Sequence, residues 1–361
     1  MDIDELTPVL TAFADRYTDT FYPKIADFFG RLFARIPFAI GEIMMYIWAF
    51  MIVLSVVFLI ALIFFHKNEA FIETVKRHFK SLLSTFISIL VIYIITWVIP
   101  FSGSVLGKGE TAVNREYSLN EVEILRNHIT DELNRQAQKV DRDEDGNLIY
   151  EDKDEVFDSV TDAMKALSDE YPRLEGYYPP MKEALCSDVL DWMNIGGYTY
   201  PYTMEITYNR YISDLYYPSL FAHESSHHQG YYKENEANFL AYLSCTGSKD
   251  DFVRYSGMIY IYSYVDKAYQ SLLSREYDPQ EAYDIYIKQP ALDEQIIKDI
   301  KKANADALKR YEQDSHPMEN LSDTAKSVSD KGWSTQKKVL AENSYDGVVD
   351  LLLEYYDGKL Y

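Results

Sequence analysis

The residues with the clearest capacity for chemistry lie within 221–245, where the chain reads FAHESSHHQGYYKENEANFLAYLSC. His223 and His227 form an HExxH sequence, and on a helix this spacing places both imidazoles on one face, where they can share a zinc ion. Glu224 lies one residue round from the first histidine, so its carboxylate can reach a water on the metal rather than the metal itself. This arrangement is typical of a zinc-dependent hydrolase.

A catalytic zinc ion needs a third protein ligand and one open position. Gly230 predicts the end of the first helix, and Glu234 lies in the first turn of the helical run that follows. Asn238 lies one turn further along the same face, where it can hydrogen-bond a ligating histidine from outside the metal shell. Glu236 is the alternative third ligand, but it points to the opposite side of the helix. We therefore prefer Glu234.

The bare HExxH sequence also fits a surface helix with two solvated histidines. Against this interpretation, three of the seven histidines fall within 223–228, and an apolar helical face follows at Ala237, Leu240 and Ala241. His228 is next to a ligand but about 100° off its face. We expect His228 to be a surface group or a supporting group rather than a ligand.

Two stretches predict transmembrane helices. Residues 43–65 and 81–99 carry no charged side chain, and each is long enough to cross about 30 Å of hydrocarbon. The second stretch ends at Pro100, and Trp97 suits an anchor at the membrane interface. A buried helix of a soluble protein is the alternative for each stretch.

The charges near these stretches predict the orientation. Lys67, Lys76, Arg77 and Lys80 lie between the two spans, so the positive-inside rule places this connection in the cytoplasm and residues 103–361 outside. Basic residues within 24–35 flank the first span on its other side and oppose this assignment. Residues 1–37 show a helical apolar stripe, which indicates a helix on the membrane surface or one packed on the soluble domain.

Composition limits the partners of the chain. The formal net charge of −22 argues against nucleic acid, and no basic stripe competes with that acidity. The two cysteines, Cys186 and Cys245, provide no disulfide framework; they could pair in an oxidising compartment or remain buried free thiols. We expect the lipid bilayer and a peptide or protein substrate as partners.

A strand is predicted immediately before the zinc helix. Residues 198–209 are rich in β-branched and aromatic side chains, and Pro201 indicates an edge position. Such a strand can accept an extended peptide by strand addition, so Tyr202, Glu205 and Asn209 are candidate substrate contacts. Tyr345, in a predicted C-terminal helix, is a candidate hydrogen-bond donor to the transition state.

An acidic segment resembles an EF-hand loop. Asp141, Asp143 and Asp145 alternate before Gly146, and Asp152 occupies the twelfth position. This spacing predicts a Ca²⁺ site, although the last ligand would be Asp rather than the longer Glu. A hairpin turning on Asp-Gly explains the same residues without calcium.

Several stretches together resemble one family of bacterial multi-pass membrane proteins, a domain of unknown function with a zinc-metallopeptidase-like motif. The stretches are 36–41, 201–205 with Asn209, 223–230, 234–245, 255–257 and 344–352. The HExxH sequence with a following Glu-x-x-x-Asn is also similar to gluzincin peptidases. That resemblance implies His223 and His227 as ligands, Glu224 as general base, Glu234 as third ligand and Asn238 as its outer neighbour. Many gluzincins place the third ligand much further on, so the shape of the cleft is not implied.

The sequence thus predicts a mainly α protein: two N-terminal transmembrane helices and an extracytoplasmic zincin-like α+β domain with a small edge-strand sheet. The expected function is a membrane-anchored zinc metallopeptidase. The alternatives are a non-catalytic domain stabilised by zinc, which would use four protein ligands, and a metal-dependent amidase acting on cell-envelope material. The expected parts are an N-terminal segment, a first span, a basic cytoplasmic loop, a second span and the catalytic domain: 1–37, 38–66, 67–80, 81–102 and 103–361.

Overall fold

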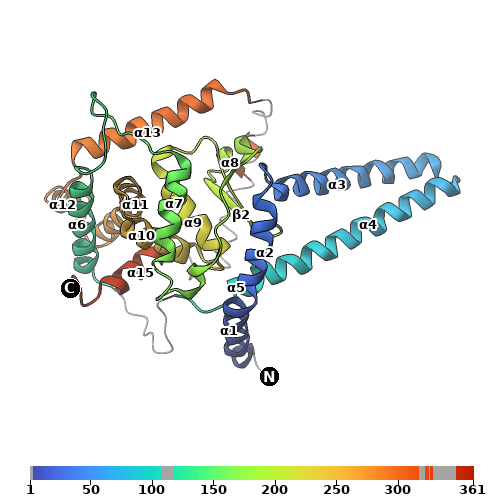
Figure 1. The fold of residues 1–361 in the computed structure, drawn as a ribbon, viewed down its shortest axis with the longest axis horizontal. Helices are drawn as coiled ribbons and strands as arrows, with labels where there is room; N and C mark the ends of the chain where they lie inside the picture. Colours follow the sequence, from blue (N-terminus) through green and yellow to red (C-terminus); the bar gives the residue numbers. More distant parts are fainter. Residues whose placement is uncertain (1–2, 107–116, 317–321, 325, 328–346) are drawn as a thin grey trace.

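The computed structural model describes residues 3–106, 117–316, 322–324, 326–327 and 347–361. A mainly helical body carries one small sheet, and two long helices project from it as an arm (Figure 1). The predicted mainly α class with a small sheet and two apolar helices is confirmed at this level.

The arm consists of two antiparallel helices. α3 (Ile40–Phe65) leads outward, and α4 (Glu69–Tyr93) returns to the body, continued by a π-helical turn, η1 (Ile94–Val98), and α5 (Ile99–Phe101). Both helices are long and apolar enough to cross a membrane, and little of either is buried inside the protein. Their apolar side chains therefore face outward, which is unfavourable in water and favourable in lipid.

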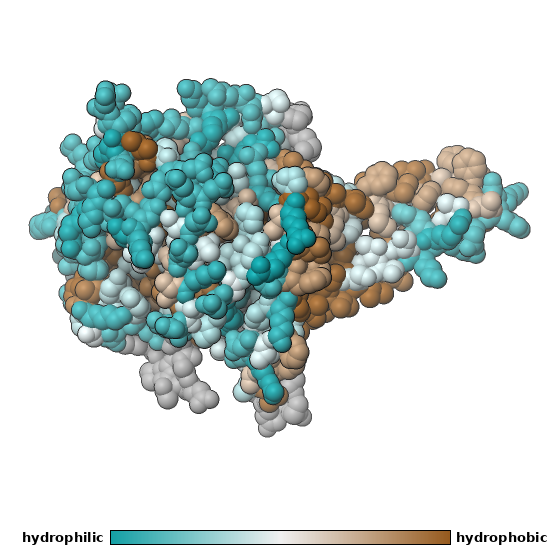
Figure 2. All heavy atoms as spheres, in the orientation of Figure 1, coloured by the Kyte–Doolittle hydropathy of each residue, from teal (hydrophilic) through white to brown (hydrophobic). Residues whose placement is uncertain are grey.

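The connection between the two helices is shorter than the sequence predicted. Asn68 begins α4 by accepting a hydrogen bond from the backbone N–H of Phe71, so most of the segment expected as a loop over 67–80 is helical. The basic residues of this segment extend the second helix beyond its apolar part. Figure 2 shows hydrophilic residues at the end of the arm, far from the body.

The N-terminal segment forms α1 (Ile3–Thr20) and α2 (Tyr22–Ala34). The buried face of α2 consists of Tyr22, Ala26 and Gly30, which pack on the body, whereas Phe28 and Leu32 stay exposed. One face of α2 therefore packs on the body as one interpretation expected, and an apolar face remains uncovered beside the arm; the position on a membrane surface stays a prediction.

The body packs around three helices of the main core: α9 (Tyr217–His228), α10 (Glu234–Gly247) and α11 (Asp251–Glu276). α6 (Leu119–Gln136), which begins at a Ser118–Glu121 capping box, α7 (Lys153–Lys165) and α15 (Gly347–Tyr356) pack against them. Shorter elements complete the body: η2 (Pro172–Glu175), α8 (Ser187–Trp192), η3 (Asp214–Tyr216), α12 (Pro279–Tyr286) and α13 (Glu294–Gln313). Cys186 and Cys245 are free thiols.

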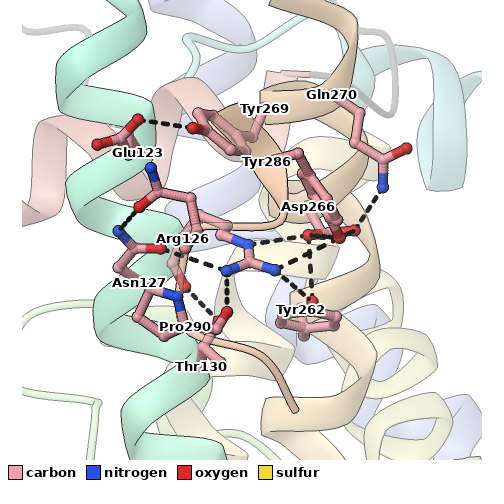
Figure 3. Close-up of polar contacts among 11 residues, drawn as sticks. Glu123, Arg126, Asn127, Thr130, Tyr262, Asp266, Tyr269, Gln270, Tyr286 and Pro290 are labelled. Carbon is pink, nitrogen blue, oxygen red and sulfur yellow. Dashed lines mark hydrogen bonds and ion pairs between the residues drawn. The ribbon is translucent and has the colours of Figure 1, made fainter. Parts of the chain in front are cut away.

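A buried ion pair fastens α6 to α11 (Figure 3). The Arg126 Nε atom lies 2.9 Å from Oδ1 of Asp266, and the arginine side chain is 2% exposed. The hydroxyls of Tyr262 and Tyr286 both donate to the Asp266 carboxylate, and the guanidinium also donates to the carbonyl oxygen of Pro290. Because these partners share the charge, the pair is tolerated inside the protein.

The sheet differs from the single edge strand predicted for 198–209. Its strands are β1 (Lys182–Glu183), β2 (Gly197–Tyr200) and β3 (Glu205–Tyr208), in the order β1-β3-β2. β2 and β3 form an antiparallel hairpin, and Met204 reverses the chain with a φ of 56°. The edge strand next to α9 is therefore β2, and β3 is central.

Candidate metal centre

The HExxH residues lie on α9, which ends in a tight turn. Gly230 has a φ of 90°, and its N–H donates to the carbonyl oxygen of His227. The N–H of Tyr231 donates to the carbonyl oxygen of Ser226. This pattern is a Schellman ending, which requires a left-handed residue after the helix. A Cβ at position 230 would lie 3.0 Å from side-chain atoms of α1 and α2, a second reason for glycine. The turn brings α10 back against α9.

Three side chains from α9 and α10 converge. Nε2 of His223 lies 3.1 Å from Nε2 of His227 and 3.3 Å from Oε2 of Glu234, while the His227 nitrogen lies 3.8 Å from Oε1 of Glu234. Ligands about 2.1 Å from a tetrahedral zinc lie about 3.4 Å from one another, so these separations fit one ion. Among the described residues, this is the single group of three or more His, Cys, Asp or Glu with such spacing.

Hydrogen bonds orient both imidazoles. Nδ1 of His223 lies 2.8 Å from Oδ1 of Asn238, and Nδ1 of His227 lies 2.9 Å from the carbonyl oxygen of Tyr231. An acceptor at Nδ1 holds the ring proton there and leaves the Nε2 lone pair for a metal. Asn238 also accepts a hydrogen bond from the Tyr260 hydroxyl at 2.5 Å. The structure thus places Asn238 where its helical phase predicted.

Glu224 lies beside the ligands but faces the sheet. It is 4% exposed, and its Oε2 accepts a hydrogen bond of 2.9 Å from the Thr199 hydroxyl on β2. Burial raises the pKa of Glu224 to about 7, although the charge of His223 and the Thr199 hydrogen bond act in the opposite direction. A carboxyl group with a pKa near 7 can both accept and release a proton at neutral pH.

The two histidines differ in their electrostatic surroundings. Burial and the neighbouring His223 lower the pKa of His227 to about 4, which keeps this ring neutral. Burial also lowers the pKa of His223, but its hydrogen bond to Glu234 and the charges of Glu234 and Glu224 outweigh that effect and raise it overall. The neighbouring carboxylates thus favour a positive charge at this position, and a bound cation would supply it.

Comparison with known proteins adds a family but no activity. Residues 17–353 match the family described as a protein of unknown function, DUF3810. The chain belongs to this family. No curated protein matches the chain, and no solved structure does.

The DUF3810 fold turns the rival ligands away from the cluster. Glu236 is buried; its Oε1 accepts the backbone N–H of Leu106 at 2.9 Å and lies 3.9 Å from Nζ of Lys233. His228 is fully buried against α2, where a Cβ at Gly30 would lie 3.0 Å from its ring. Of the two positions expected for His228, the surface position is excluded, because α2 covers that side of α9.

The three candidate substrate contacts, by contrast, serve structural roles. The Tyr202 ring packs edge-on against Trp48 of α3 with centroids 4.9 Å apart. Asn209 donates to the Asp191 carboxylate and to the carbonyl oxygen of Ile195. These contacts lie outside the ligand cluster, and the role of Tyr202 and Asn209 as substrate contacts stays a prediction.

Glu205 is the third of these residues, and it caps a helix. Its carboxylate accepts the backbone N–H groups of Ile40 and Gly41 at 3.0 and 2.8 Å, and it pairs with Lys182. α3 has no local side-chain cap, so its first N–H groups bond to a carboxylate distant in sequence. The sequence could not show this partner.

The acidic segment adopts the hairpin alternative. Arg142 and Leu148 form an antiparallel bridge, and the Asp143 carboxylate accepts the N–H groups of Asp145 and Asn147. Asp152 instead begins α7 by accepting the N–H of Asp154. Within the described residues, Asp141, Asp143, Asp145 and Asp152 form no metal-sized group, so calcium binding gains no structural support.

Two further points complete the account of the site. Tyr345 lies outside the described residues, so the prediction for it is not tested. The sequence reasoning missed Thr199, which holds Glu224, and Tyr232, whose ring stacks on His227 with centroids 5.9 Å apart. Tyr232 adjoins the turn after α9, a place where a contact with the motif could have been anticipated.

Proposed function

We propose that this chain is a membrane-anchored zinc-dependent metallopeptidase. The convergence of two histidine Nε2 atoms and the Glu234 carboxylate, with Glu224 beside them, carries the proposal. Three ligands and a neighbouring carboxylate are the parts of a catalytic zinc site with an open position. The non-catalytic alternative needs a fourth protein ligand; among the described residues, Glu236 and His228 face elsewhere.

Each residue has a defined part in the reaction. His223, His227 and Glu234 would hold Zn²⁺, which would supply Lewis acidity to the substrate carbonyl and lower the pKa of a water. Glu224 removes a proton from that water as the water oxygen bonds to the carbonyl carbon. Glu224 then passes the proton to the leaving nitrogen as the C–N bond breaks. Thr199 and Asn238 position Glu224 and His223.

The edge strand β2 supports a peptide as the substrate. β2 pairs with β3 on one side, and its Thr199 bonds Glu224, so a chain laid along β2 would pass the site. Strand addition uses backbone hydrogen bonds and therefore suits polypeptides more than small amides. β2 overlaps the first part of the 198–209 segment to which the sequence had assigned this role.

The arm supports the proposed location. The basic cluster lies in the connection and the first turns of α4, at the far end of the arm from the body. The positive-inside rule therefore favours a cytoplasmic tip and an external body. The labelling of an introduced cysteine by a membrane-impermeant reagent in intact cells tests this orientation. Labelling of Glu73→Cys from outside the cell would mean that the orientation is the opposite one.

Peptide hydrolysis by the zinc-loaded wild type, compared with Glu224→Gln, tests the activity. Glutamine keeps the shape of the side chain and can still accept the Thr199 hydrogen bond, but it cannot accept the proton of water. We expect Glu224→Gln to bind zinc as the wild type does and to lose turnover about 10²-fold or more. Equal turnover in the two proteins would contradict the mechanism.

A further inference from the structure

Aromatic side chains join the candidate metal centre to the second apolar helix. The Trp97 ring in η1 meets the Tyr232 ring edge-on with centroids 6.2 Å apart, and Tyr232 stacks on His227. Trp97 also stacks between Tyr93 and Phe101. A metal ligand is therefore two ring contacts away from the apolar surface of the arm.

The first apolar helix is fixed to the sheet beside the same site. Gly41 packs so closely that a Cβ there would lie 2.9 Å from the Thr203 hydroxyl and nearer still to the Tyr200 ring. Trp48, two turns further along α3, contacts Tyr202 in the β2–β3 turn. The turn between the edge strand and β3 thus rests on the beginning of α3.

Tyr198 joins the edge strand to the second of these sets of contacts. It lies on β2 one residue before Thr199 and is 43% exposed. Its ring meets the Tyr200 ring edge-on with centroids 5.1 Å apart, and the Tyr200 ring packs on Gly41, so Tyr198 is joined to the beginning of α3.

The length of the apolar part of the arm locates the bilayer. Residues 81–101 carry no charge and, at about 1.5 Å per residue, extend about 32 Å, close to the thickness of the hydrocarbon layer. The charged first turns of α4 lie at the other end. This places Trp97 at the interface on the body side, where tryptophan and tyrosine are enriched in membrane proteins.

The N-terminal helices extend this apolar surface. Large apolar side chains of α1 and α2 remain exposed, and Figure 2 shows hydrophobic residues gathered where the arm joins the body. The exposed residues are Val9, Leu10 and Phe13 of α1, Phe21 between the two helices, and Phe28 and Leu32 of α2. A body resting on lipid through this surface would hold β2 at the interface.

We infer that the site takes its substrate from the bilayer surface: an extended polypeptide segment directly adjoining a helix that remains anchored in the membrane. This inference rests on the proposed peptidase function for the reaction and on the geometry of the arm for the substrate class. A soluble peptide must reach the site from water. An anchored peptide is already held at the depth of the site by the helix that anchors it. Confinement to one bilayer also raises the effective concentration of the substrate.

The position of the site is tested without any reaction. Tyr198→Cys, in a Cys186→Ser background, is labelled with bimane in phosphatidylcholine vesicles, with Tyr283→Cys on α12 as the control; Tyr283 is 59% exposed. We expect lipids with brominated acyl chains to quench the label at position 198 and not at position 283. Equal emission at position 198 with and without bromine would overturn the inference even if the protein is a peptidase.

The substrate class is tested with the wild-type protein. One degenerate peptide is compared in two forms, one free and one fused to a Leu-Ala transmembrane helix, both with the zinc-loaded protein in the same vesicles. We expect the anchored form to be cleaved about tenfold faster or more, next to its helix. Equal rates, or faster cleavage of the free form, would overturn the inference and leave the peptidase proposal standing. Cleavage of neither form would overturn both.

Discussion

Replacement of Asn238 should weaken zinc binding without touching a ligand. The Asn238 side chain is fully buried, and its Oδ1 is the acceptor that faces Nδ1 of His223. Asn238→Ala leaves that N–H without its partner in a space closed to bulk water. The imidazole can then rotate or move its proton to Nε2, and either change removes the lone pair from the metal position.

The expected size follows from the geometry. Loss of an outer-shell partner of a metal-bound histidine costs 10- to 100-fold in affinity, or about 1.4–2.8 kcal/mol. We expect the upper part of this range, because the site is buried and the same oxygen also accepts from Tyr260. Asn238→Asp should retain most of the affinity, since a carboxylate can accept the same N–H.

The assay is zinc competition with a chelator of known affinity, and Asn235→Ala is the matched control. Asn235 is a buried amide on the same helix; it follows Glu234 in the chain, but its side chain lies against Gly347 of α15. We expect Asn235→Ala to keep wild-type affinity. An equal loss in both variants, or wild-type affinity in Asn238→Ala, would refute the assigned role of Asn238.

Three other results are expected. Gly230→Ala should lower the free energy of unfolding, measured in urea, by about 1–3 kcal/mol, because the position has a positive φ and faces α1 and α2. The control Gly247→Ala should cause little change in the same measurement, since a Cβ there meets nothing within 4 Å. Arg126→Met should lower the free energy of unfolding by about 3–5 kcal/mol, because it leaves a buried carboxylate unpaired. The double variant with Asp266→Leu should recover much of that loss in the same assay. No recovery would contradict the account of the pair. Removal of zinc by a chelator should lower Tm. Where free zinc exceeds Kd a thousandfold, bound zinc adds about 4 kcal/mol to the free energy of unfolding, and the chelator removes this contribution. An unchanged Tm would contradict coupling of metal binding to folding.

The parts of the site that are local in sequence could be predicted. Helical phase alone brought His223, His227, Glu234 and Asn238 to one place, because α9 and α10 are separated by a single tight turn. The uncharged stretches likewise predicted the two apolar helices, since length and composition decide that class of helix.

The errors arose where a residue bonds to a distant partner. Glu205 and Tyr202 looked like substrate contacts, but they contact the first turns of α3, more than 150 positions earlier in the chain. His228 was expected as a surface or a supporting group, and the cover of α2 excludes the surface position. The single predicted edge strand became a hairpin, because the left-handed Met204 turns the chain where periodicity shows no break. Such tertiary contacts leave no local pattern in one sequence.

The metal content of the purified protein tests the central claim most directly. Elemental analysis of the wild type is compared with Glu234→Gln and Glu236→Gln, two isosteric changes on the first turn of α10. We predict one zinc per chain in the wild type, retention in Glu236→Gln, where the amide oxygen can still accept the Leu106 N–H, and loss in Glu234→Gln. No zinc in the wild type, or equal zinc in all three proteins, would contradict the assignment of His223, His227 and Glu234 as the metal site.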